Sequence, residues 1–172
     1  LGQFMDFGSY AKDSVFLKKA EDVMQTLKES FEKYGWDGKW YLQATTDGFE
    51  KIGSNENEEG KIFLNPQLWS LISSIGDSER AVTAMENVTE YLLRDYGALL
   101  LAPAYTSPRT DIGYITRYAP GLRENGGVYT HAATWAVWAY SLLKEGNLAY
   151  QAYRRICPPN RCSDIDLYCA EP

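Results

Sequence analysis

The stretch AATWAVWAYSLL, residues 132–143, decides the fold because its apolar side chains recur at the spacing of an α-helix. Gly146-Asn147 breaks this helix, and residues 148–156 form a partner helix that ends before Pro158. Two helices joined by such a short break pack against each other as a helical hairpin. The side chains expected on the inner face of the first helix are Trp135, Ala136, Ala139, Leu142 and Leu143.

The same period recurs upstream of this hairpin. Residues 14–34 predict a long amphipathic helix. Pro66 suits the first turn of a helix that runs through Ile72, and Ser78 opens another that ends near Arg94. The apolar face of the long helix is expected to contain Phe16, Ala20, Val23, Met24, Leu27, Phe31 and Tyr34.

The connections between these helices carry turn signals. Asp37-Gly38 and Asp47-Gly48 predict a short hairpin, and residues 98–104 fit a buried strand or core loop. Residues 105–127 contain Pro and Gly throughout, and an irregular segment of this length is usually functional. Helices with almost no strand pattern predict an all-α fold of helical hairpins. Periodicity leaves open both a simple bundle and a ring of helix pairs with its active site on the loops at one end.

Composition excludes several classes of protein. The chain of 172 residues is long enough for one domain, and its net charge of −6 gives no basic surface for nucleic acid. No apolar run reaches the length of a membrane span and no secretory leader is visible, so we expect a cytoplasmic protein without membrane contact. The spacing of Cys157, Cys162 and Cys169 fits free thiols better than a metal site or a disulfide framework. The sequence also lacks a Gly-rich phosphate loop, and we expect no cofactor.

The single histidine, His131, lies at the expected start of the helix 132–143. A lone histidine in such a place is often structural. However, Gly126-Gly127 allows close approach of a ligand to the backbone, and a helix N-terminus attracts anions through its unpaired N–H groups. We therefore interpret His131 as part of an anion site.

Arg123 and Glu124 precede this histidine, and they can form an ordinary surface ion pair. In a loop rich in Gly and aromatic residues they can instead offer donors and acceptors to sugar hydroxyls. Tyrosines that can supply stacking faces are Tyr105, Tyr114, Tyr118 and Tyr129. A second polar cluster contains Glu56, Glu58 and Glu59, which fit a solvated loop or a cap on Lys61 better than paired catalytic carboxylates.

Several blocks of the sequence, in this order, together resemble glycoside hydrolase family 94. That family includes cellobiose, chitobiose and laminaribiose phosphorylases and the C-terminal part of cyclic β-1,2-glucan synthases. The blocks are WDGKWY (36–41), EEGKIFLNPQ (58–67), PAY (103–105), IGYITRYAPG (112–121), RENGGVYTH (123–131) and YCAEP (168–172).

The resemblance implies an (α/α)6 barrel and an inverting reaction. A carboxylic acid protonates the glycosidic oxygen of a β-linked di- or oligosaccharide while inorganic phosphate, as co-substrate, attacks the anomeric carbon. The product is an α-glycosyl 1-phosphate. Members of the family often form homodimers, which makes a homodimer possible here.

Residue roles follow from the same resemblance. His131 matches a phosphate-binding histidine, and Glu124 matches a residue that contacts the transferred sugar. Arg123 stands where cellobiose phosphorylases have a lysine that contacts the acceptor sugar. Tyr114 stands where they carry an acceptor-binding glutamate, which favours another disaccharide or a β-1,2-glucan as substrate.

The catalytic aspartate of the family lies in an upstream Trp-Asn-Asp-Gly-type motif that this sequence does not contain. A downstream Thr-Gly that completes the phosphate site is also missing. We therefore expect residues 1–172 to be a single region, the incomplete C-terminal part of a catalytic (α/α)6 barrel, which is inactive alone. Two alternatives stay open: the phosphorylase-like region of a cyclic β-1,2-glucan synthase, and a non-catalytic carbohydrate-binding half-barrel.

Overall fold

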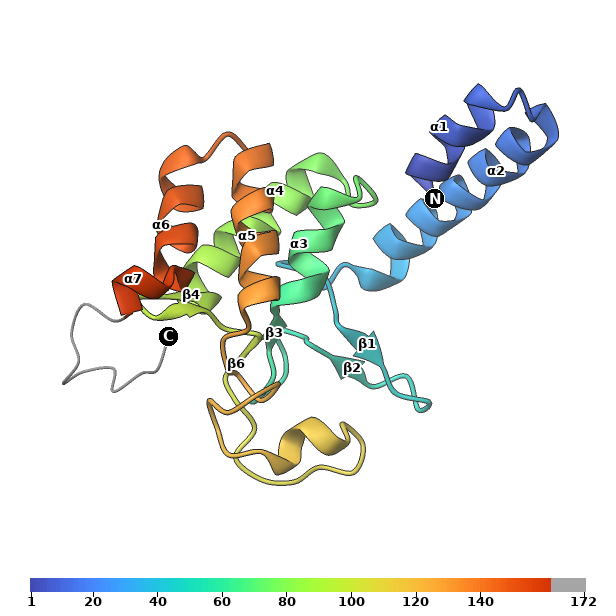
Figure 1. The fold of residues 1–172 in the computed structure, drawn as a ribbon. Coiled ribbons are helices and arrows are strands. Elements are labelled where there is room, and N and C mark those ends of the chain that lie inside the picture. The colour runs from blue at the N-terminus through green and yellow to red at the C-terminus, as the bar shows by residue number, and fades with distance from the viewer. Residues whose placement is uncertain (162–172) are drawn as a thin grey trace.

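The structure is a computed structural model, and it describes residues 1–161. The described part is mainly helical, as the periodicity predicts (Figure 1). Its α-helices are α1 (Gly2–Tyr10), α2 (Ser14–Ser30), α3 (Leu64–Ile72), α4 (Ser78–Asn87), α5 (Thr130–Leu142), α6 (Gly146–Ile156) and α7 (Pro158–Arg161). The π-helical turns η1 (Phe31–Gly35) and η2 (Val88–Leu92) extend α2 and α4, and η3 (Tyr114–Arg117) is a 3-10 helix.

Short antiparallel strand pairs connect these helices. The pair β1–β2 forms the hairpin predicted around Asp47-Gly48. The pair β3–β6 joins segments on either side of α3 and α4, whereas β4 and β5 form a tight hairpin after η2. The strands are β1 (Ala44–Thr45), β2 (Lys51–Ile52), β3 (Ile62–Phe63), β4 (Leu93–Arg94), β5 (Gly97–Ala98) and β6 (Leu101–Ala102).

The predicted α5–α6 hairpin is present, and its small side chains form the centre of the core. Ala136 and Ala139 of α5 are fully buried, so α3 and α6 can pack closely on either side of this helix. Two details of the prediction are wrong. Leu142 is 48% exposed whereas Tyr140 is buried, and Gly146-Asn147 forms the start of α6 rather than the break between the two helices. The turn instead lies at Lys144, whose φ of 61° reverses the chain.

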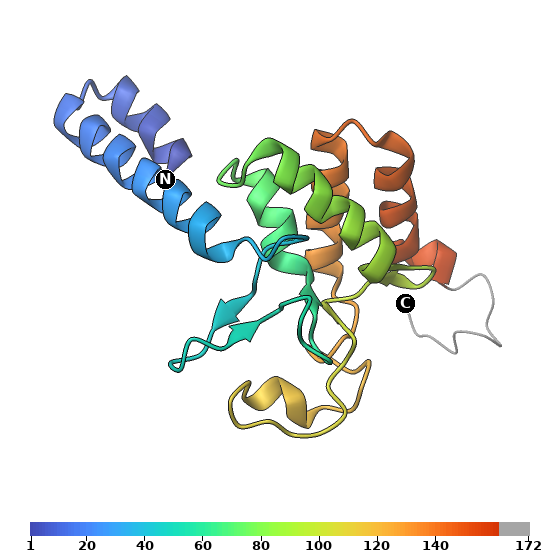
Figure 2. The ribbon, with the colours of Figure 1, turned by 180° about the vertical axis from the view of Figure 1, so that it is seen from behind.

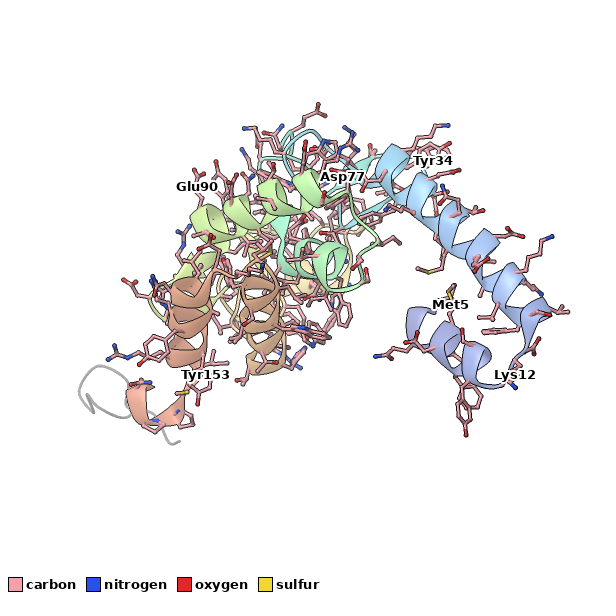
Figure 3. The ribbon with its side chains drawn as sticks, turned by 90° about the horizontal axis from the view of Figure 1, so that it is seen from above. Met5, Lys12, Tyr34, Asp77, Glu90 and Tyr153 are labelled. Carbon is pink, nitrogen blue, oxygen red and sulfur yellow. The ribbon has the colours of Figure 1, made fainter. Side chains whose placement is uncertain are left out.

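Helices α1 and α2 form an arm (residues 1–30) that lies away from the other helices, as Figure 3 shows for Met5 and Lys12. The helix predicted over 14–34 is confirmed as α2 with η1. Its predicted apolar face is only partly buried, since Val23 and Leu27 are 43% and 47% exposed. Within the described residues α1 alone packs along α2, and a single small helix cannot cover the whole face.

The strand pairs and the segment 105–127 gather at the end of the molecule where α5 begins (Figures 1 and 2). A small second core of Phe63, Leu101 and Tyr105 supports this end. The buried side-chain amide of Gln67 on α3 connects this end of the molecule to the helices through hydrogen bonds. Its Oε1 accepts from the Tyr41 N–H at 2.8 Å, and its Nε2 donates to the Tyr41 and Phe63 carbonyls at 2.8 and 2.9 Å.

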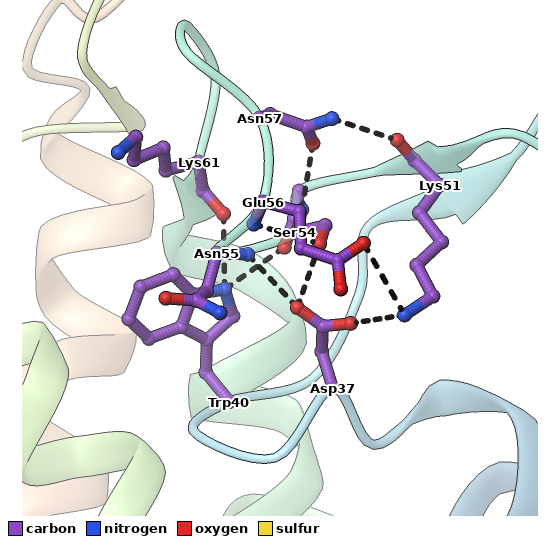
Figure 4. A network of polar contacts seen from close by, with 9 residues as sticks. Asp37, Trp40, Lys51, Ser54, Asn55, Glu56, Asn57 and Lys61 are labelled. Carbon is purple, nitrogen blue, oxygen red and sulfur yellow. Dashed lines mark hydrogen bonds and ion pairs between the residues drawn. The ribbon is translucent and has the colours of Figure 1, made fainter.

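The base of the β1–β2 hairpin is fixed by a network around Asp37 (Figure 4). The Asp37 carboxylate, with a side chain only 2% exposed, accepts from Lys51 Nζ and Ser54 Oγ at 2.7 Å and from the Asn55 N–H at 2.8 Å. Burial alone raises the pKa of Asp37, but the hydrogen bonds from Lys51, Ser54 and Asn55 outweigh burial and hold the pKa below its ordinary value.

We expect the substitution Asp37→Asn to destabilise this hairpin by about 2–3 kcal/mol at neutral pH, because it removes charge-assisted hydrogen bonds. The folded-state pKa of Asp37 is lowered, so its contribution is complete above about pH 4 and is lost as the pH falls through the folded-state pKa. Amide hydrogen exchange of residues 37–57 in wild type and variant measures the difference. A difference that stays constant from neutral pH to about pH 3 would contradict this account.

Candidate functional site

The segment 105–127 is held at both ends by one buried side chain, Asn125. Its Oδ1 accepts from the Tyr105 N–H, and its Nδ2 donates to the carbonyls of Tyr105 and Tyr118, each at 2.8 Å. Asn125 is fully buried, so these bonds are shielded from water. The clamp holds the backbone at Tyr105 and Tyr118 against Asn125, and so helps to fix the position of the loop between them.

A tight turn follows from residue 122 to residue 127. Arg123 adopts a φ of 50° and Gly126 a φ of 84°. The Gly127 N–H donates to the Arg123 carbonyl at 2.9 Å, and a Cβ at Gly127 would lie 2.4 Å from that oxygen. Contact within the chain therefore requires glycine at position 127. The close approach of a ligand to this backbone stays a prediction.

Glu124 projects from this turn. The Tyr129 hydroxyl donates to its Oε1 at 2.9 Å, whereas Oε2 is buried and has no hydrogen-bond partner among the described residues. The nearest cation to Oε2 is Arg123, whose Nε lies 3.9 Å away. The backbone N–H of Glu124 and the Tyr129 hydroxyl lower the pKa of the carboxyl group, so it is ionised at neutral pH. In the described part of the chain Oε2 accepts no hydrogen bond and has only the long ion pair with Arg123, so it keeps acceptor capacity for a ligand.

Glu124 lines a pocket of about 190 Å³ at the loop end of the molecule. One part of its wall is polar and the other is apolar. Such a mixed wall suits a small polyhydroxylated ring, which presents hydroxyls at its edge and C–H groups on its faces. The lining residues are Gln43, Phe63, Asn65, Leu100, Ile115 and Glu124.

The side chains of Arg123 and Tyr114 are both exposed. The Arg123 guanidinium lies 4.9 Å from the Tyr118 ring centroid, and the Tyr118 ring meets Tyr114 edge-on at 5.1 Å. Tyr114 is 64% exposed and lines a different pocket of about 240 Å³ beside Arg117. The structure therefore places Arg123 next to Glu124, and it connects Tyr114 to them only through Tyr118.

His131 lies in the first turn of α5, where the sequence places it. Its imidazole packs between the rings of Tyr129 and Trp135, with centroids at 5.6 and 5.3 Å, and forms no hydrogen bond within residues 1–161. The α5 N-terminus also lacks a side-chain cap. Unpaired N–H groups and a free imidazole thus occur together. Tyr129 contacts both His131 and Glu124, so one residue connects the two predicted ligand groups.

Two other expectations are corrected by their surroundings. Tyr105 is 2% exposed, so its ring packs in the second core and offers no stacking face. The acidic loop does not cap the side chain of Lys61, whose carbonyl instead accepts from Trp40 Nε1. Glu56 lies 4.0 Å from Lys51, and Glu59 accepts from the Thr106 N–H at 3.0 Å. Glu56 and Glu59 thus help to hold the surrounding loops.

The described residues contain neither a membrane-spanning helix nor a metal-binding cluster. In residues 1–161 no helix is long and apolar enough to cross a membrane. The same residues contain no group of three or more acidic, histidine or cysteine side chains that could hold a metal ion. Cys157 has a free thiol, and Cys162 and Cys169 lie outside the described residues, as does the block at 168–172.

The helical core thus carries, on the loops at one end, a pocket with a mixed polar and apolar wall, which is the kind of place where proteins bind small ligands. The chain belongs to the glycosyl hydrolase 94 superfamily, because it matches the catalytic domain of that family over residues 1–172. This confirms the resemblance drawn from the sequence motifs.

Among characterised proteins, the chain is 35% identical over 161 residues to solabiose phosphorylase of Paenibacillus borealis, covering 94% of the chain and 21% of that enzyme. It is 33% identical to N,N'-diacetylchitobiose phosphorylase of Vibrio furnissii, covering 100% and 22%. It is 35% identical to the cyclic beta-(1,2)-glucan synthase NdvB of Rhizobium meliloti, covering 100% and 6%. The chain thus spans about a fifth of the phosphorylases' length.

Proposed function

We propose that the chain is part of the catalytic domain of an inverting phosphorylase that cleaves a β-linked di- or oligosaccharide with inorganic phosphate. The observation that carries the proposal is the Glu124 oxygen that accepts no hydrogen bond from the described residues, on a side chain that lines a pocket and is joined through Tyr129 to the exposed His131 at a helix N-terminus. Sugar and phosphate are the two ligands such a pair of sites suits. The matched phosphorylases support this reading.

The residues of the chain bind and orient the reactants in this proposal. Glu124 accepts hydrogen bonds from hydroxyls of the transferred sugar, and Arg123 faces the acceptor sugar. His131 and the N–H groups of the α5 N-terminus hold phosphate. The acid that protonates the glycosidic oxygen comes from a residue that is not part of this sequence. Phosphate attacks the anomeric carbon from the opposite face, and the product is an α-glycosyl 1-phosphate.

We also propose that residues 1–172 form part of an (α/α)6 barrel. The exposed apolar side chains of the arm support this, since Phe4 and Phe7 are 68% and 65% exposed. Further helices of a barrel would cover this surface. The cytoplasmic location, the homodimer and the inactivity of residues 1–172 alone remain predictions.

A second candidate function is the phosphorylase-like region of a cyclic β-1,2-glucan synthase. The match to the Rhizobium meliloti synthase favours it, because that match covers the entire chain at the same identity as the solabiose phosphorylase match. Both functions use the same site and the same reaction, and they differ in the substrate. In the second candidate function the substrate is a linear β-1,2-glucan.

The test uses the intact parent, that is, the full-length enzyme of which the proposal makes this chain a part. It is incubated with β-linked disaccharides and β-1,2-oligoglucans, with and without inorganic phosphate. We expect release of a glycosyl 1-phosphate from at least one of them, only when phosphate is present. Binding of a sugar without any turnover would support the non-catalytic alternative instead.

We expect the variant His131→Ala of the parent to raise the KM for phosphate about 10-fold, since a hydrogen bond to a charged group contributes about 1.5 kcal/mol or more. The KM for the sugar should change less than twofold. Initial rates over a matrix of phosphate and sugar concentrations separate the two constants. An unchanged KM for phosphate would remove His131 from the phosphate site.

A further inference from the structure

Two exposed amide side chains, those of Gln43 and Asn65, line the Glu124 pocket. Gln43 precedes β1, and Asn65 is the second residue of α3. Neither side-chain amide has a hydrogen-bond partner within residues 1–161. Gln67 and Asn125 differ in this respect, since both are buried and use their amides to hold the backbone. The amides of Gln43 and Asn65 therefore remain available to a ligand.

The pocket that contains them is fixed by backbone hydrogen bonds. The Leu64 N–H donates to the Leu100 carbonyl at 2.9 Å, and the Leu100 N–H donates to the Gly127 carbonyl at the same distance. The Gln43 N–H donates to the Ile52 carbonyl, also at 2.9 Å. The hairpin, the start of α3 and the Glu124 loop are thus joined around one space. The three polar side chains do not need to be ordered by a large rearrangement before they bind.

The chemistry of the lining selects one class of ligand. A carboxylate only accepts hydrogen bonds, whereas each amide both donates and accepts them. The combination of one carboxylate and two amides suits vicinal hydroxyls, which also donate and accept. Phe63, Leu100 and Ile115 supply apolar contacts for the C–H face of a ring. None of the described residues that line the pocket is a cation, and Glu124 is ionised. A negatively charged sugar is therefore disfavoured.

We propose that Gln43 and Asn65 are specificity-determining residues that hydrogen-bond the hydroxyls of the same sugar ring as Glu124, and that this ring is an uncharged hexopyranosyl unit. This inference rests on the proposed phosphorylase function. It assigns the transferred sugar, rather than the acceptor, to the pocket of Gln43, Asn65 and Glu124.

The experiment compares the variants Gln43→Leu and Asn65→Leu of the intact parent with wild type. Each should lower kcat/KM for the disaccharide roughly 3- to 10-fold, the effect of one neutral hydrogen bond, and leave the KM for phosphate within twofold. The matched control is Asn147→Leu, since Asn147 is an exposed asparagine in the same position of α6 as Asn65 in α3. The control variant should behave as wild type.

Singly deoxygenated substrates provide a second measurement. At least one deoxygenation of the transferred ring should slow the wild type and have no further effect on Gln43→Leu or Asn65→Leu. A disaccharide whose transferred ring is a glucuronic acid should not be cleaved.

The outcomes separate the two proposals. An active wild type whose two leucine variants match the Asn147→Leu control would overturn the role of Gln43 and Asn65. If the disaccharide with a transferred glucuronic acid is cleaved as fast as the neutral disaccharide, the assignment of an uncharged ring is wrong. A wild type without phosphate-dependent cleavage of any substrate would instead contradict the proposed function.

Discussion

Replacing Asn125 by alanine is expected to destabilise the segment 105–127 by about 3–5 kcal/mol, because three buried backbone groups lose their hydrogen-bond partner. These groups are the N–H and carbonyl of Tyr105 and the carbonyl of Tyr118. The helical core does not depend on this clamp and should stay folded. Since Glu124 adjoins Asn125, the parent enzyme should lose its activity at the same time.

Amide hydrogen exchange measures this effect segment by segment. In Asn125→Ala, exchange should accelerate in residues 105–127 and remain slow in α3 and α5. The control is Asn147→Ala, an exposed asparagine at which the same change should have no effect. Slow exchange of residues 105–127 in Asn125→Ala would show that the amide clamp does not hold the loop.

The variant Glu124→Gln of the parent is expected to lower kcat/KM for the sugar substrate roughly 10- to 100-fold, the range for hydrogen bonds to a charged acceptor. Glutamine keeps the shape of the side chain, and its amide oxygen can still accept from the Tyr129 hydroxyl. The loss therefore reports on Oε2, which accepts no hydrogen bond within the described residues, rather than on the fold. The KM for phosphate should change little.

Glu58→Gln is the matched control because Glu58 is an exposed glutamate of the acidic loop. It should leave kcat/KM unchanged, which also tests the alternative of paired catalytic carboxylates in that loop. If Glu124→Gln retains full kcat/KM for every substrate, the sugar-binding role of Glu124 is wrong.

Much of the fold follows from side-chain periodicity. The alanines of residues 132–143 recur at the helical period, and α5 is found there. Period alone does not show which apolar residues find a partner. Val23 and Leu27 lie on a clear apolar face, yet both are exposed in the described part of the chain. The position of a turn also depends on local backbone conformation, which is why Lys144 rather than Gly146 reverses the chain.

The candidate site was predictable to a smaller extent. The motif Gly-Gly followed by a histidine is a local sequence signal for a turn before a helix. The structure places the turn and the start of α5 at that motif. The roles of Asn125 and Gln67 have no such signature, because Tyr105 and Tyr41, to which each makes two hydrogen bonds, lie 20 and 26 residues away in sequence. Gln43 enters the pocket through the same long-range packing. Burial and unsatisfied hydrogen-bonding groups emerge only when the chain is folded.

The most direct test of the account is phosphorus NMR of the intact parent with inorganic phosphate and the β-linked sugar that it cleaves. We predict that the phosphate signal falls as an α-glycosyl 1-phosphate signal rises in equal amount, because phosphate itself attacks the anomeric carbon with inversion. Release of free sugar with no loss of inorganic phosphate, or formation of the β-anomer, would contradict the account.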